Sequence, residues 1–217
     1  MTHERRSFTA QCECEYLLER PEGAGLLVVA LHGFGSNADV MLRLARMWFP
    51  NEAIAAVQAP HPFYTSANAQ EVGYCWATHL HSAESVRLHH QMLNHVLDEL
   101  KWPAEKTLLL GFSQPVGMNY RFAATYPKRV GGVIGVCGGV PKNWEDGPYQ
   151  TVTASLLHLA RSEDEIYPPS MTSSYEERLR KRAADVTYHL LPGGHRFPSL
   201  GRPIVSAWVR ERFGVEV

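Results

Sequence analysis

The stretch LLLGFSQPVG, residues 108–117, runs from an apolar segment directly into a serine. Gly111 lies two positions before Ser113, and Pro115 lies two positions after it. The pattern Gly-x-Ser-x-Gly is typical of a sharp turn between a strand and a helix, where a nucleophilic serine is presented. The stretch departs from that pattern only at Pro115. It therefore predicts a strand over 107–112, a serine at the turn and a helix after it.

Strand-like apolar runs and helical patterns alternate along the rest of the chain. Strands are expected at 26–32, 53–60, 107–112, 130–138, 154–160 and 186–191, and helices at 36–48, 82–102, 173–184 and 203–213, with another helix that ends near Tyr126. Continuously apolar strands, each followed by a helix, indicate a mostly parallel central sheet with helices on both faces. The alternating stretch AQCECEYLLE, residues 10–19, predicts an antiparallel edge strand. We expect a single α/β domain over residues 1–217.

The bulk properties exclude several classes of protein. The chain has 217 residues and a formal net charge of −1, which gives no electrostatic footprint for nucleic acid. The longest apolar run, 26–31, is too short to span a membrane, and the first ten residues lack the apolar core of a secretory signal. Of the four cysteines only Cys12 and Cys14 are close in sequence, so we interpret all four as reduced thiols of a cytoplasmic protein. A monomer or a homodimer is expected.

Three residues with complementary chemistry follow predicted strands. Ser113 follows 107–112, Asp164 follows 154–160, and His195 follows 186–191. Parallel strands place their carboxyl ends at one edge of the sheet, where ligands bind. A serine needs a base to become a nucleophile, and a carboxylate fixes the tautomer of that imidazole. The order serine, aspartate, histidine is that of the α/β-hydrolase fold, which we therefore expect.

The acidic member stands in a run of three carboxylates, Glu163, Asp164 and Glu165. A solvated acidic turn explains at least two of them. Asp164 is preferred as the catalytic acid because its side chain is the shortest of the three.

The stretch LHGFGSN, residues 31–37, predicts a loop that stabilises an oxyanion. Such a site needs two preorganised N–H donors. In this fold one donor belongs to the residue after the nucleophile, here Gln114, and the other to a loop after an early strand. Gly33 and Gly35 allow that loop to turn tightly, and Phe34 is the expected donor.

Nearly the whole chain resembles the carboxylesterase, phospholipase and acyl-protein thioesterase family of serine hydrolases. The resemblance is carried by LHGFGSN (31–37), GYCWA (73–77), GFSQ (111–114), VCGGVP (136–141), HLARSEDEIYP (158–168) and GGHRFP (193–198). It implies a catalytic triad of Ser113, Asp164 and His195, with the backbone amides of Phe34 and Gln114 as the oxyanion hole. It implies no metal or organic cofactor.

The chain departs from the family pattern at two places. The family usually has two glycines after the Ser-Gln pair, where this chain has Pro115 and Val116, and a glycine in the acid loop where it has Ala160. Position 115 lies in the first turn of a helix, where the fixed φ of proline fits and its missing N–H costs nothing. Proline nevertheless restricts the preceding Gln114, whose amide is a predicted oxyanion donor. We expect Pro115 to affect the rate of catalysis and not the fold.

The predicted function is hydrolysis of short-chain or aryl esters through an acyl-enzyme on Ser113, with thioesters as further candidate substrates. Phe34, Trp76 and Phe197 fall in loops that adjoin the predicted site. They predict a largely apolar pocket for a small-molecule ester.

A second interpretation is an oxidoreductase. GFGSNA, residues 33–38, matches Gly-x-Gly-x-x-Ala between a strand and a helix, as in dinucleotide-binding proteins. That motif expects an acidic residue at the end of the next strand to bind the ribose, whereas this strand ends in Gln58 and Pro60. The oxidoreductase interpretation is therefore disfavoured.

Two further alternatives concern metals and inactive relatives. The histidines that suggest a metal site show no known ligand spacing, so we expect them to be exposed on a helix: His79, His81, His89, His90 and His95.

A weakly active or inactive small-molecule-binding protein of the same fold is supported only by Pro115. The intact serine, aspartate and histidine argue against it.

Overall fold

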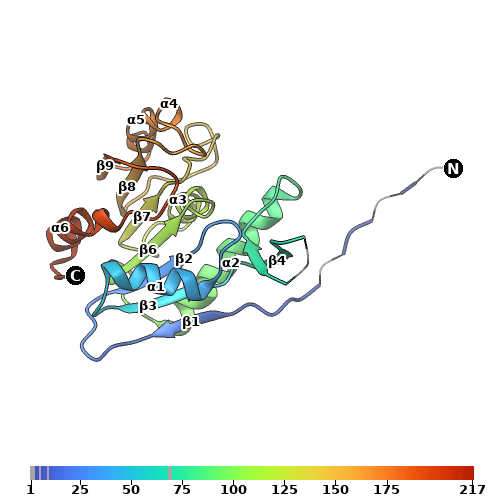
Figure 1. The fold of residues 1–217 in the computed structure, drawn as a ribbon, viewed down its shortest axis with the longest axis horizontal. Helices are drawn as coiled ribbons and strands as arrows, with labels where there is room; N and C mark the ends of the chain where they lie inside the picture. The colour runs from blue at the N-terminus through green and yellow to red at the C-terminus, as the bar shows by residue number, and fades with distance from the viewer. Residues whose placement is uncertain (1–2, 5, 9, 68–69) are drawn as a thin grey trace.

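The computed structural model describes residues 3–4, 6–8, 10–67 and 70–217. Its centre is a seven-stranded sheet in the order β1-β3-β2-β6-β7-β8-β9, and only β1 runs antiparallel to its neighbour (Figure 1). The strands are β1 (Tyr16–Glu19), β2 (Leu27–Leu31), β3 (Ala53–Val57), β6 (Thr107–Phe112), β7 (Gly132–Val136), β8 (Ser155–Arg161) and β9 (Val186–Leu191). This confirms the predicted α/β architecture.

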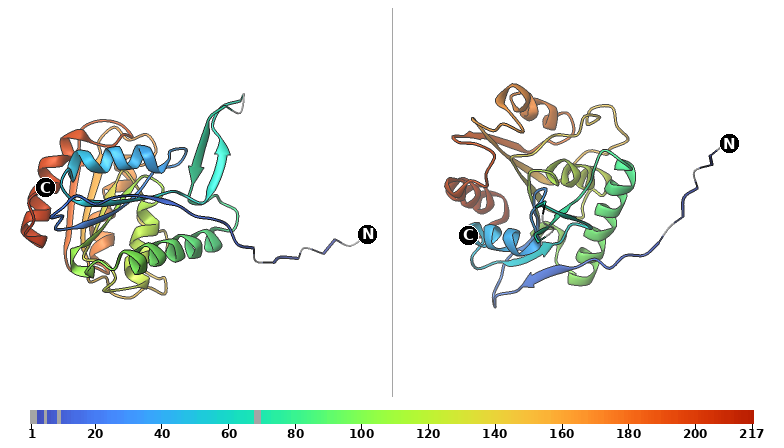
Figure 2. Two further views of the ribbon diagram at one scale, coloured as in Figure 1. Left: turned by 90° about the horizontal axis from the view of Figure 1, so that it is seen from below. Right: turned by 45° about the vertical axis from the view of Figure 1, so that its right-hand side comes forward.

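Helices cover both faces of the sheet (Figure 2). On one face lie α1 (Ala38–Trp48) and α6 (Arg202–Phe213), and on the other lie α2 (Ser82–Leu100), α3 (Val116–Thr125) and α5 (Tyr175–Arg180), with the short α4 (Pro169–Thr172) before α5. Successive side chains of a strand point to opposite faces, so Val29 packs with α2 and α3 while Val28 packs with α1 and α6. Burial on both faces explains why the inner strands β2, β3 and β7 are apolar throughout.

Two predicted elements are shorter than expected. The edge strand was predicted over 10–19, but β1 has only four residues, because β3 offers partners only to Tyr16–Glu19. The helix predicted near 173–184 ends at Arg180, since Ala183 pairs with Val152 in an isolated bridge and leaves the helical path.

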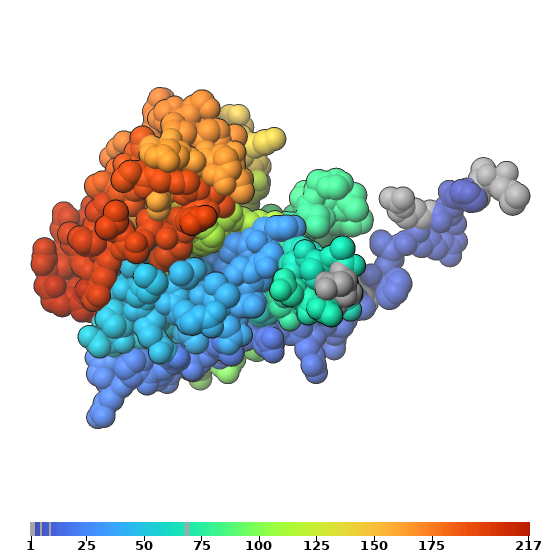
Figure 3. Space-filling model, in the orientation of Figure 1, coloured from blue at the N-terminus to red at the C-terminus, as the bar shows by residue number. Residues whose placement is uncertain are grey.

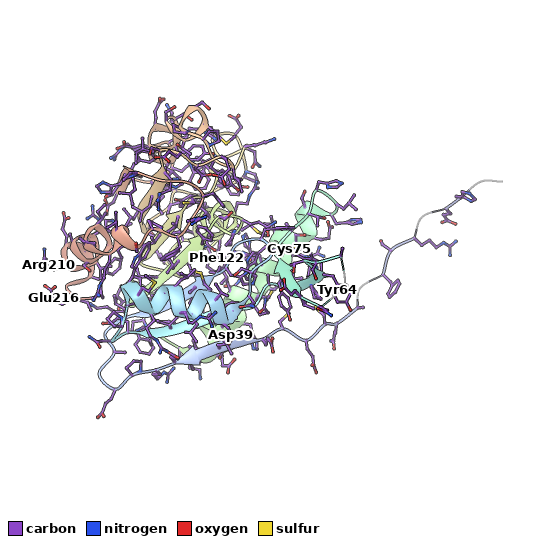
Figure 4. All side chains as sticks on the ribbon, in the orientation of Figure 1. Asp39, Tyr64, Cys75, Phe122, Arg210 and Glu216 are labelled. Carbon is purple, nitrogen blue, oxygen red and sulfur yellow. The ribbon has the colours of Figure 1, made fainter. Side chains whose placement is uncertain are left out.

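A β-hairpin was missed in the stretch after β3. It consists of β4 (His61–Tyr64) and β5 (Val72–Cys75), and it projects from the body of the molecule (Figure 2). Pro62 made the stretch resemble a loop, yet proline is tolerated in an edge strand. Figure 4 labels Tyr64, far out on the hairpin, and Cys75, where β5 returns to the body.

Within the described part of the chain, each helix is either too short or too polar to cross a membrane.

Candidate active site

Ser113 lies in a strained turn between β6 and α3. Its φ is +64°, a left-handed conformation that is uncommon for a residue with a side chain. The turn is tight, because a Cβ at Gly111 would lie 2.8 Å from Nδ2 of Asn119 and 3.4 Å from Cα of Val116. A larger residue at 111 would therefore have to displace the side chain of Asn119.

Pro115 fits the start of α3. Its φ of −74° and ψ of −10° are helical, and its carbonyl accepts the N–H of Asn119 at 2.8 Å. Val116, which replaces the other glycine after the Ser-Gln pair, packs against Gly138. A Cβ at Gly138 would lie only 2.3 Å from Cβ of Val116. The chain thus admits both larger residues without disrupting the turn.

The structure brings the predicted serine, histidine and aspartate into one chain of hydrogen bonds. Nε2 of His195 lies 2.9 Å from Oγ of Ser113, and Nδ1 lies 2.9 Å from Oδ2 of Asp164. A carboxylate can only accept, so Nδ1 carries the proton and Nε2 is free to accept the serine proton. Oδ1 of Asp164 also accepts the backbone N–H groups of Ile166 and Tyr167, at 2.9 and 2.8 Å. The buried carboxylate is fully partnered and fixes the ring.

Of the three consecutive acids, Asp164 is the one whose carboxylate reaches the ring of His195. The side chain of Glu163 is exposed. Glu165 is also exposed, but its Oε2 accepts the backbone N–H of His195 at 3.2 Å. Glu165 therefore supports the loop that carries the histidine.

The glycine loop after β2 packs directly against the serine turn. A Cβ at Gly33 would lie 3.3 Å from Cβ of Ser113 and 3.0 Å from Cδ1 of Phe112. Gly35 has a φ of +77°, which allows the loop to fold back. Figure 3 shows the yellow-green segment after β6 in a hollow between the blue segment after β2 and the red segment after β9.

Two backbone amides at this junction are available to a ligand. In the described part of the chain, neither Phe34 nor Gln114 donates its N–H to an acceptor. The carbonyl of Ser113 accepts the N–H of Val116 at 3.2 Å, in the turn that leads into α3. Because the two groups of a trans peptide point in opposite directions, the N–H of Gln114 points away from the helix.

His32 shapes the glycine loop. The N–H of Ala59 donates to its Nε2 at 3.1 Å, so the ring proton lies on Nδ1 and is donated to the carbonyl of Gly33 at 2.8 Å. Burial lowers the pKa of His32, which favours this neutral form. Gln58, at the position where a dinucleotide-binding protein needs an acid, instead donates to Nε2 of His32 and accepts from the N–H of Ala38.

The three aromatic residues predicted to line the substrate pocket lie in different environments. Phe34 is 61% exposed, and its ring lies 4.8 Å from that of Phe63. Phe197 is partly buried, and its ring lies 4.2 Å from that of Trp48. Trp76 has no exposed surface and donates its Nε1–H to the carbonyl of His32 at 2.8 Å. The buried Trp76 therefore supports the glycine loop, whereas Phe34 is open to solvent; their roles toward substrate stay a prediction.

One cluster of side chains has the spacing of a metal site among the described residues. The ligand atoms of Cys137, Asp164 and His195 all lie within 4.8 Å of one another. Burial, reinforced by the nearby Asp164 carboxylate, raises the pKa of Cys137 to about 12. The hydrogen bonds between Asp164 and Nδ1 of His195, and between Nε2 of His195 and Ser113, already use the groups that would have to bind a metal.

The prediction that five histidines are exposed on a helix is wrong for His89 and His90, and His79 and His81 precede α2. His79, His81 and His95 are exposed, but His89 and His90 are buried between α2 and α3. Nε2 of His89 lies 3.2 Å from Oδ1 of Asn119, and the ring of His90 packs against Phe122 and Tyr126.

A third buried imidazole lies on the same side of the sheet. Nδ1 of His158 lies 2.8 Å from the hydroxyl of Tyr120. Burial is the main cause that lowers the pKa of His89 to about 3 and the pKa values of His90 and His158 to about 4.

The buried histidines predict an acid-sensitive fold. In the unfolded chain their pKa returns to about 6.5, so between pH 6.5 and 4 the unfolded state binds more protons. The free energy of unfolding must fall as the pH falls, by about 2 kcal/mol per buried histidine at pH 5. Urea unfolding at pH 7.5 and 5.0 measures this. His90→Phe should reduce the pH dependence by about one histidine's share, whereas His61→Gln, at an exposed position, should not. An unfolding free energy that does not change with pH would contradict the prediction.

A family model described as Phospholipase/Carboxylesterase matches residues 18–201. No curated protein sequence matches the chain significantly.

Solved structures of several esterases share the fold. Esterase PE8 superposes with a TM-score of 0.76 at 22% identity, over 93% of this chain and 100% of that one. A carboxylesterase from Mesorhizobium loti gives 0.75 at 19% identity, over 90% and 94% of the two chains. Acyl-protein thioesterase 2 from Zea mays gives 0.73 at 19% identity, over 92% and 99%. At these identities the similarity concerns the fold alone.

Proposed function

Because this chain belongs to the phospholipase/carboxylesterase family, we propose that it hydrolyses carboxylic esters through a covalent acyl-enzyme on Ser113. The observation that carries the proposal is the contact of 2.9 Å between Oγ of Ser113 and Nε2 of His195. That contact provides a nucleophile and its base at hydrogen-bond distance, in a strained turn that presents the hydroxyl.

In the acylation step Nε2 of His195 takes the proton of Ser113 as Oγ attacks the ester carbonyl carbon. The carbonyl oxygen becomes an oxyanion, which accepts hydrogen bonds from the backbone amides of Phe34 and Gln114. The imidazolium then protonates the leaving alcohol as its bond to carbon breaks. Asp164 remains ionised throughout and stabilises the imidazolium.

In the deacylation step the same base acts on water. His195 takes a proton from a water molecule, whose oxygen attacks the acyl carbon. The second oxyanion occupies the same two amides, and its collapse releases the carboxylic acid and returns the proton to Ser113.

Apolar side chains beside the reactive pair favour substrates with short acyl chains or aryl leaving groups. Phe34 and Phe63 stack beside the glycine loop, and Ile166, directly after the acid loop, is 54% exposed. The ring of Tyr167 lies 5.9 Å from that of His195. A thioester would undergo the same two steps with a thiol as the leaving group.

Turnover of p-nitrophenyl acetate, butyrate and octanoate tests the proposal. We expect saturable hydrolysis of the acetate and the butyrate, with a burst of one p-nitrophenol per chain wherever deacylation is slower than acylation. Binding of these esters without turnover would instead support the alternative of an inactive small-molecule-binding protein.

A further inference from the structure

The side chain of Gln114 connects the serine turn to the segment after β5. Its Oε1 accepts the N–H of Trp76 at 2.8 Å, and its Nε2 donates to the carbonyl of Ala77 at 2.7 Å. A backbone N–H can only donate and a carbonyl can only accept, so both amide atoms of Gln114 are correctly matched. The side-chain amide thus accepts one backbone hydrogen bond and donates another to residues 76–77.

Trp76 extends this connection to the glycine loop. Its Nε1–H donates to the carbonyl of His32 at 2.8 Å, and its ring is fully buried. Tyr74 of β5, two residues before Trp76, also holds the loop, because its carbonyl accepts the N–H of Gly35 at 2.9 Å and its N–H donates to the carbonyl of Ser36 at 3.1 Å. The end of β5 therefore contacts both segments that carry the available amides.

The direction of the Phe34 amide follows from these contacts. The carbonyl of Gly33 accepts hydrogen from Nδ1 of His32 at 2.8 Å and from the N–H of Ser36 at 3.2 Å. This carbonyl belongs to the same peptide unit as the N–H of Phe34, and the two point in opposite directions. The two hydrogen bonds to the carbonyl of Gly33 therefore also fix the direction of the N–H of Phe34.

We infer that the side chains of Gln114 and Trp76 are positioning groups that set the two oxyanion donors at a fixed separation. The inference rests on the proposed function. We call the linkage of Gln114, Trp76 and His32 the amide clamp. It touches no substrate atom and acts only through the amides of Phe34 and Gln114.

The amide clamp also explains how the chain accommodates Pro115. Proline restricts the backbone of Gln114 on one side, and the left-handed Ser113 restricts it on the other. The two side-chain hydrogen bonds of Gln114, to the backbone of Trp76 and Ala77, add a third restraint on the position of this residue. The amide is therefore fixed in this chain without the glycine that the family usually has at position 115.

Gln114→Met tests the amide clamp, because methionine keeps the length of the side chain and loses both hydrogen bonds. The backbone amide remains, so the expected loss in kcat is about 10- to 100-fold, below the roughly 10²–10³ caused by removing a donor. KM for p-nitrophenyl acetate should change less than about threefold, since the ground state does not use the oxyanion hole fully. Gln91→Met makes the same chemical change on the exposed face of α2 and should have wild-type kinetics.

A transition-state analogue separates positioning from general destabilisation. Trifluoroacetophenone adds to Ser113 as a hemiketal: Oγ bonds to the carbonyl carbon, the carbonyl oxygen becomes the oxyanion, and the serine proton passes to His195. Its inhibition constant should rise in Gln114→Met by the same factor by which kcat/KM falls, with the melting temperature nearly unchanged. Trp76→Phe should show the same signature with a smaller loss, and the double variant should lose less than the product of the two.

Three outcomes would overturn the inference. The first is wild-type kcat in Gln114→Met, which would refute the amide clamp while leaving the proposed function intact. The second is a loss confined to KM or matched by a lower folded fraction, with the inhibition constant unchanged. The third is a wild-type protein without Ser113-dependent ester hydrolysis, which would refute the proposed function and the amide clamp with it.

Discussion

Replacing Ser113 with alanine should lower the hydrolysis of p-nitrophenyl butyrate by about 10⁴-fold or more. The hydroxyl is the only group of the described site that lies within hydrogen-bond distance of Nε2 of His195. Without it no acyl-enzyme forms, and the remaining site can only stabilise the oxyanion of direct attack by water. Alanine also tolerates the backbone at +64° about as well as serine does, so folding should be unaffected.

Initial rates and far-UV circular dichroism measure the two effects of Ser113→Ala. Ser162→Ala, an exposed serine at the end of β8, is the matched control and should retain wild-type turnover. Residual activity of Ser113→Ala above about a tenth of wild type would mean that another group performs the attack.

Asp164→Asn should lower kcat by a similar factor, about 10⁴-fold. Oδ1 of Asp164 accepts two backbone N–H groups, from Ile166 and Tyr167, so an asparagine must keep its oxygen there. Its NH2 group then faces Nδ1 of His195 and forces the ring proton onto Nε2. In that tautomer the ring cannot accept the proton of Ser113.

Glu163→Gln removes a charge at the neighbouring position without touching the ring, and should change kcat less than about threefold. The comparison of the two variants in kcat at pH 8 decides which acid orients the histidine. Equal losses would show that local negative charge, and not the geometry of Asp164, supports catalysis.

The parts of the fold that could be predicted are those that depend on local pattern. The inner strands β2, β3 and β7 are continuous apolar runs because they are buried on both faces, and β6 and β8 are apolar along most of their length. The parallel arrangement then requires residues after neighbouring strands to meet at one edge, which is why Ser113, Asp164 and His195 could be expected together.

The β4–β5 hairpin could not be predicted because its strands are short and exposed, and contain Pro62. The contacts that the end of this hairpin makes with the glycine loop could therefore not be predicted either. An aromatic residue in a loop near the site, such as Trp76, is equally consistent with lining the pocket and with supporting the loops around it. Only its contact with His32 distinguishes the two roles.

The buried histidines show a different limit. The sequence of α2 places His89 and His90 on the helix but does not say that α3 covers them. Their burial depends on Asn119, Phe122 and Tyr126, which lie about 30 residues further along the chain. A polar residue that is satisfied by such distant partners carries no local sequence signal.

The most direct test of a nucleophilic Ser113 is labelling with a fluorophosphonate, followed by peptide mass spectrometry. We expect one phosphonyl group per chain, on the peptide that contains Ser113, and no label on protein that was heat-denatured beforehand. Absence of label from the native protein, or a label on any other serine, would contradict it.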